Sequence, residues 1–307
     1  MVEHDWRLEG KVGNQIPMRP AEYRAGLVLV TASAVAWSTA GLFTRFIPLD
    51  SWTMLAWRGI FGALGIAVVI LAMERRNALL GFQNMGWPSW LFAIVSAIGM
   101  IFFITSLKHT TVAHVAVIYA TVPFLAAALS WLVMRERPSS SAITASLAAL
   151  AGVALMVGFG MEGGFFGDLL AFGMTLSMAL MMVIARHYRD IPVMPAACLS
   201  ALLSGLVCWP IGDPLAVSGY ELLLLMLFGV VNSAIGLALF TLGARLLPAV
   251  ETALIGSLDA PLAPLWVWLV FSETPSGSTI LGGAIVFIAV AAHLIAGASQ
   301  MARSSAQ

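Results

Sequence analysis

The chain has 307 residues, of which 60% are hydrophobic and only 10% charged, and its mean hydropathy is +0.95. A soluble domain has about a quarter of its residues charged, so this chain cannot cover a water-facing surface. The 15 basic and 15 acidic residues balance, so no net charge points to nucleic acid or to an acidic substrate. The composition disfavours a soluble enzyme, a DNA-binding protein and a disulfide-stabilised scaffold, and it indicates a polytopic membrane protein.

Ten segments are long and apolar enough to cross a bilayer, which takes about 20 mostly apolar residues. The connections between them are short and leave no separate soluble domain. Residues 1–24 contain no apolar core of signal-peptide length, and we expect a cytoplasmic tail there. A second cytoplasmic tail is expected at 299–307. The predicted fold is all-α, with spans at 25–47, 51–72, 88–107, 111–134, 138–159, 165–186, 193–211, 220–242, 248–271 and 277–297.

Orientation follows from the basic residues, which concentrate on the cytoplasmic side of a membrane protein. With the N-terminus in the cytoplasm, the outer side holds only Arg45 and Lys108, and Arg58 lies within a span. Twelve basic residues fall on the other side, which predicts that both termini are cytoplasmic. These are Arg7, Lys11, Arg19, Arg24, Arg75, Arg76, Arg135, Arg137, Arg186, Arg189, Arg245 and Arg303.

An internal repeat is the most informative feature of the sequence. Residues 106–143 align without gaps on 243–280, an offset of 137, with 12 identities in 38 positions that include a Trp-Leu-Val run and a Pro-Ser pair. We therefore predict two five-helix repeats, at 25–160 and 161–298. Because five is odd, the second repeat enters the membrane inverted, as in secondary transporters whose halves rock to alternate access.

These features, together with four short motifs, resemble the drug/metabolite transporter superfamily over roughly residues 25–297, and the EamA-type exporters most closely. The motifs are Ala-Trp-Ser-Thr at 36–39, Trp-Arg-Gly at 57–59, Gly-Asp-Leu-Leu-Ala at 167–171 and Leu-Asp-Ala-Pro at 258–261. More distantly, the chain resembles the YddG-type branch, whose members export aromatic and other amino acids. The resemblance implies export of a small amphipathic metabolite through a central cavity lined by both repeats.

Ionisable groups within a span are costly unless they face protein or water, so each is a functional candidate. Asp259, followed by Pro261 and Pro264, would bind a substrate amine or titrate, or else act as a capping or packing carboxylate. Arg58 would hold a substrate carboxylate, or else pair with an acid or extend outward. Glu251 lies eight residues before Asp259, near the same face of a continuous helix. If both face the cavity, they form an acidic track.

Further candidates are polar or aromatic groups placed at mid-depth or near the outer surface. Trp37 would line the cavity or pack in the core, and Ser38 and Ser233 would contact substrate or bond to their own helix. His114 is expected to be a gate residue, with Glu251 as a possible coupling residue. The remaining cavity candidates are Tyr119, Thr121 and Asn232.

The predicted function is export of small amphipathic metabolites, amino acids including aromatic ones above all, by a protein of the bacterial inner membrane. No Asp or Glu occurs between Arg24 and Leu49, which favours a facilitator. The alternative is a proton-coupled multidrug or nucleoside/metabolite antiporter. The sequence contains no H-E-x-x-H zinc motif and no G-x-S-x-G nucleophile motif, which disfavours an intramembrane enzyme. We expect no cofactor and no metal site, and no partner other than the substrate and membrane lipid, so that the monomer would suffice for function.

Overall fold

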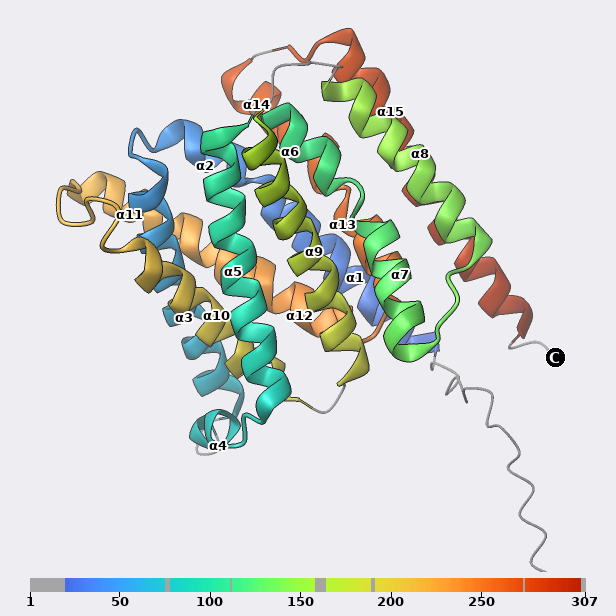
Figure 1. Ribbon diagram of the computed structural model, residues 1–307, viewed down its shortest axis with the longest axis horizontal. Helices are drawn as coiled ribbons and strands as arrows, with labels where there is room; N and C mark the ends of the chain where they lie inside the picture. Colours follow the sequence, from blue (N-terminus) through green and yellow to red (C-terminus); the bar gives the residue numbers. More distant parts are fainter. Residues whose placement is uncertain are drawn as a thin grey trace, which may run out of the picture.

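The computed structural model describes residues 20–74, 78–110, 112–157, 164–188, 191–272 and 274–304 (Figure 1). Most of the predicted tail at 1–24 and the last three residues of the chain lie outside the described residues. Every regular element in the described part is helical, as predicted. The elements are α1 (Pro20–Ser38), α2 (Ala40–Phe46), α3 (Ser51–Glu74), α4 (Ala78–Gln83), α5 (Trp87–His109), α6 (Val112–Tyr119), α7 (Val122–Met134), α8 (Ser140–Val157), α9 (Phe165–His187), α10 (Val193–Cys208), α11 (Gly219–Phe228), the π-helix η2 (Gly229–Leu237), α12 (Ala238–Ala244), α13 (Ala249–Gly256), α14 (Asp259–Phe271) and α15 (Gly277–Ser304).

Eight helical stretches in the described residues are long and apolar enough to cross a membrane. They agree with eight of the ten predicted spans to within a few residues. The other two predicted spans correspond to α8 and α10, which are apolar but shorter. Large apolar side chains also point outward, as expected for a lipid-facing surface. Val28, Leu64, Val68, Leu269 and Ile288 are each more than half exposed.

Four of the predicted spans are not continuous helices. The first is interrupted at Thr39, the fourth at 120–121 and the ninth at 257–258, and the eighth contains the π-helix. Hydropathy does not register such breaks, because the residues around them are as apolar as the rest. Pro123 and Pro261 each lie in the first turn after a break, where a missing N–H costs no hydrogen bond.

Two of these interruptions, in the fourth and the ninth spans, lie at equivalent positions of the two repeats. The backbone N–H of Thr121 donates to Ile118, and 137 residues later that of Leu258 donates to Ile255. The helices that follow end in the same way, since Arg135 and Ser272, also 137 residues apart, both have φ of 57°. The sequence match between the repeats therefore reflects a match in backbone structure.

Contacts between helices also occur in corresponding sets. The first helix of each repeat packs on the third span of the other, α1 on η2 and α12, and α9 on α5. The second spans, α3 and α10, pack on each other, as do the fifth spans, α8 and α15, which lie side by side in Figure 1. Glycines allow these close crossings. A Cβ on Gly59 would lie 2.6 Å from the Cα of Gly205, and one on Gly152 would lie 2.7 Å from the carbonyl oxygen of Gly282.

Candidate substrate site

The centre of the candidate site is the contact between α1 and the π-helix. A π-helix is wider than an α-helix and is frequently found at functional sites. Here two of its carbonyls accept side-chain donors from α1. The Trp37 indole donates to the carbonyl of Asn232 at 3.0 Å, and the Ser33 hydroxyl donates to that of Gly236 at 2.9 Å. Without a side chain at Gly236, the Trp37 ring can approach the helix backbone.

Arg58, about two turns into α3, reaches this contact from the other side. One terminal nitrogen donates to the Asn232 side-chain oxygen at 3.0 Å, and the other lies 3.0 Å from the Met100 sulfur. The guanidinium carbon is 5.4 Å from the centre of the Phe228 ring. The side-chain nitrogen of Asn232 in turn donates to the carbonyl oxygens of Ala36 and Trp37, at 3.4 and 3.3 Å. Asn232 thus joins three helical segments.

The positive charge of Arg58 has no acidic partner among the described residues. The residue is 8% exposed, so its guanidinium does not extend to the surface. Its Nε is buried without a hydrogen-bond acceptor. A buried, unpaired charge costs several kcal/mol by general estimates. Of the three roles expected for Arg58, pairing with an acid and extending outward therefore do not fit this environment.

The polar contacts continue along α1 to α14. The Ser38 hydroxyl donates to the carbonyl of Val35 at 2.7 Å, the bond to its own helix that the sequence favours, and it also accepts from the Trp266 indole at 2.8 Å. Trp37, Ser38, Arg58 and Asn232 therefore lie in one connected set of contacts. We call these four residues, with Trp266, the central network.

Asp259 lies directly after the break in the ninth span, in the first turn of α14. Its side chain is half-buried, and Tyr119, the last residue of α6, is close enough to interact with it electrostatically. The expected acidic track assumed a continuous helix from Glu251 to Asp259. Because the helix is interrupted at 257–258, the eight-residue spacing does not place the two carboxylates on one face.

The remaining candidates lie outside the central network. The Thr121 hydroxyl donates to the carbonyl of Ile118 at 2.6 Å within its own helix, and Ser233 is buried against Gly62 of α3. His114 lies near the start of the fourth span, and its Nδ1 is 3.0 Å from a carboxylate oxygen of Asp168. Glu251 begins the ninth span and accepts a hydrogen bond from Tyr23.

Sequence reasoning missed Trp266, Met100 and Phe228. Trp266 could have been found, because it follows Asp259 by seven residues, two turns along the same face of α14. Met100 and Phe228 carry no such signal, since a methionine or a phenylalanine in an apolar span is ordinarily a packing residue.

A model of the EamA-like transporter family matches the chain twice, over residues 24–158 and 165–295. The chain belongs to this family. The resemblance to EamA-type exporters of the drug/metabolite transporter superfamily is thereby confirmed, and the chain is a multi-pass membrane protein of a transporter family. The likeness to the YddG-type branch stays a prediction.

Two curated bacterial proteins are similar to this EamA-family chain. "Uncharacterized transporter YwfM" of Bacillus subtilis is 27% identical over 271 residues, covering 85% of this chain and 90% of that protein. "Protein LicB" of Haemophilus influenzae is 25% identical over 122 residues, covering 38% of this chain and 41% of that protein. A solved crystal structure with 20% identity has a TM-score of 0.76 and covers 88% of this chain and 97% of that chain. This last likeness shows the fold alone.

Proposed function

We propose that the protein is a facilitative exporter of small amphipathic metabolites that carry a carboxylate, amino acids including aromatic ones above all. Its ten spans form two inverted repeats, 25–160 and 161–298, with both termini in the cytoplasm of a bacterial cell. The substrate crosses the inner membrane by alternating access through a cavity between the repeats. The monomer suffices for this cycle, because one chain contains both halves.

The observation that carries this proposal is the buried guanidinium of Arg58, which has no acidic partner in the described part of the chain. A carboxylate is the natural partner of a guanidinium, because its two oxygens match two parallel N–H donors. Arg58 can donate further hydrogen bonds to a ligand, because its Nε has no acceptor in the structure. The indoles of Trp37 and Trp266 lie in the same network and suit the apolar part of the ligand. Asp259, at the helix break, binds the substrate ammonium group.

A proton-coupled antiporter for drugs, nucleosides or other metabolites is the second candidate function. The position of Asp259 favours it, because a half-buried carboxylate at a break in a spanning helix is placed to exchange a proton during a transport cycle. The two candidates differ in one respect that can be measured directly, namely whether a pH gradient drives accumulation.

The deciding experiment is uptake of labelled amino acids into liposomes that contain the purified protein, with and without a pH gradient. We expect uptake without the gradient and competition by aromatic amino acids. Arg58→Gln should lower transport of tryptophan more than tenfold, because the ion pair with the substrate is lost. It should change transport of tryptamine, which lacks the carboxylate, far less.

Arg45→Gln is the matched control, since Arg45 lies at the end of α2, with its guanidinium 5.8 Å from the Phe271 ring. Transport of tryptophan by this variant should stay within about twofold of the parent. Uptake only in the presence of a pH gradient would favour the antiporter. Equal loss of tryptophan and tryptamine transport in Arg58→Gln would refute carboxylate recognition by Arg58.

A further inference from the structure

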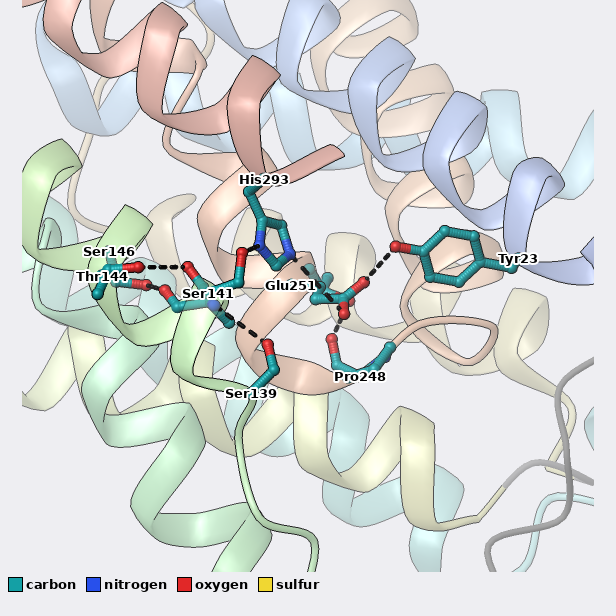
Figure 2. Close-up of polar contacts among 10 residues, drawn as sticks. Tyr23, Ser139, Ser141, Thr144, Ser146, Pro248, Glu251 and His293 are labelled. Carbon is teal, nitrogen blue, oxygen red and sulfur yellow. Dashed lines mark hydrogen bonds and ion pairs between the residues drawn. The ribbon is translucent and has the colours of Figure 1, made fainter. Parts of the chain in front are cut away.

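A cluster of polar residues joins four helices at one end of the protein (Figure 2). The Tyr23 hydroxyl of α1 donates to one oxygen of the Glu251 carboxylate on α13 at 2.8 Å. On the other side of that carboxylate, Nε2 of His293 on α15 lies 3.8 Å from the second oxygen. Nδ1 of the same imidazole is 3.0 Å from the Ser141 hydroxyl on α8. Tyr23 and His293 are each 4% exposed, and Glu251 and Ser141 are partly buried, so little of the cluster reaches solvent.

A second carboxylate cluster occupies the opposite end. The Asp168 carboxylate, in the first turn of α9, accepts a hydrogen bond from the Thr110 hydroxyl at 2.6 Å. Nδ1 of His114, at the start of α6, lies 3.0 Å from the same oxygen. The fourth span runs from His114 to Met134, just before Ser141 of the first cluster. At about 1.5 Å per residue this separates the two clusters by about 30 Å.

The two clusters occupy equivalent places in the repeats. His114 and Glu251 are 137 residues apart, the offset of the sequence match. The neighbouring contacts are equivalent as well. A Cβ on Gly167 would lie 2.6 Å from the Cβ of Thr110, and one on Gly26 would lie 2.8 Å from the Cγ of Leu247, the residue 137 positions after Thr110. Each cluster therefore lies at an equivalent contact, between the fourth span of one repeat and the first helix of the other. We call each of these two contacts a joint.

Each joint contains a hydrogen bond that crosses between the repeats. Tyr23 lies on α1, the helix that continues into the first repeat, and Glu251 lies in the second repeat. Thr110 and His114 lie in the first repeat and Asp168 in the second. Movement of one repeat against the other must break such a bond at the end that opens. Both bonds are formed in this structure, in which Arg58 of the central network is only 8% exposed.

We propose that the two clusters are the gates of the transporter, each closing one end of the substrate pathway, so that one opens only while the other is closed. The inference rests on the transport function proposed above and specifies how alternating access is enforced. Breaking one gate favours the conformation open at that end, which in turn keeps the opposite gate closed.

The test uses a matched pair of variants that each remove one hydroxyl donor to a carboxylate, Tyr23→Phe and Thr110→Val. The parent carries Cys198→Ala, Cys208→Ala and a reporter, Ser38→Cys, in the central network. Labelling by a membrane-impermeant thiol reagent is measured in membrane vesicles of either orientation. We expect each variant to raise the labelling rate from one face about fivefold and to lower it from the other. The two variants should affect opposite faces.

Tyr220→Phe is the control, because Tyr220 is 67% exposed on α11, and it should label like the parent. Glu251→Gln and Asp168→Asn provide the same comparison should either hydroxyl variant fail to reach the membrane. Unchanged labelling from both faces, or a rise from the same face in both variants, would overturn the inference. Labelling requires no substrate, so failure of the unsubstituted protein to transport amino acids would refute the proposed function without deciding the gates.

Discussion

Asn232 offers a way to separate the structural role of the central network from its role in transport. Asn232→Ala removes the acceptor of Arg58 and the two longer contacts to the carbonyls of α1. A hydrogen bond to a charged group contributes about 1.5–3 kcal/mol, and two long ones add about 1 kcal/mol, so the unfolding free energy falls by about 2.5–4 kcal/mol. At about 2 °C per kcal/mol, the melting temperature should fall by about 5–8 °C.

Asn232→Asp should behave differently, because a carboxylate at this position pairs with the Arg58 guanidinium. The ion pair offsets the lost contacts to the Ala36 and Trp37 carbonyls, so the melting temperature should stay within about 3 °C of the parent. The same pairing occupies the charge that we assign to the substrate. Transport of tryptophan should therefore fall more than tenfold, and transport of tryptamine should persist.

The assay combines thermal unfolding of the detergent-solubilised variants with uptake of both compounds into liposomes. A stable Asn232→Asp protein that transports tryptophan at the parental rate would refute the reasoning, because a neutralised Arg58 could not then be the carboxylate site. An equal fall of the melting temperature in Asn232→Ala and Asn232→Asp would show that the Asn232 amide stabilises the fold by its contacts to α1 rather than by its hydrogen bond to Arg58.

Two further predictions concern helix packing and Asp259. Gly59→Ala places a methyl group 2.6 Å from the backbone of Gly205 and should lower the free energy of unfolding by about 1–3 kcal/mol, seen as a lower melting temperature. Gly41→Ala is the control, because its methyl group would meet nothing within 4 Å, and its melting temperature should be unchanged or slightly higher. Asp259→Asn should abolish amino-acid counterflow, since a neutral amide cannot pair with the substrate ammonium group. Counterflow that survives while pH-driven accumulation is lost would instead support proton antiport, and undiminished transport in both assays would exclude a role for Asp259.

The sequence predicts the architecture well because length and hydropathy determine where a helix can cross a bilayer. It does not predict the breaks at 120–121 and 257–258, since a helix with a missing hydrogen bond has the same composition as one without. The internal repeat could have indicated them: prolines follow both breaks within a few residues, and an apolar span seldom needs one.

The central network is harder to predict, because it depends on which distant residues meet. Arg58 and Asn232 are separated by 174 residues, and their pairing requires both the close crossing of α3 on the π-helix and the wider turn of that helix. Each residue was a candidate by its polarity and depth alone. Their contact, and the absence of an acid beside Arg58 in the described residues, follow only from the packing.

The two kinds of site relate differently to the duplication. The gate joints are equivalent in both repeats, down to a glycine packed against the second residue before α6 and before α13. The central network is not: the π-helix interrupts the third span of the second repeat, whereas α5, its counterpart in the first, is a regular 23-residue helix. Opening the two ends in turn is a symmetric task, which duplicated joints can perform. Binding a ligand with one carboxylate is asymmetric, and Arg58, which has no acidic partner among the residues that the structure describes, suits it.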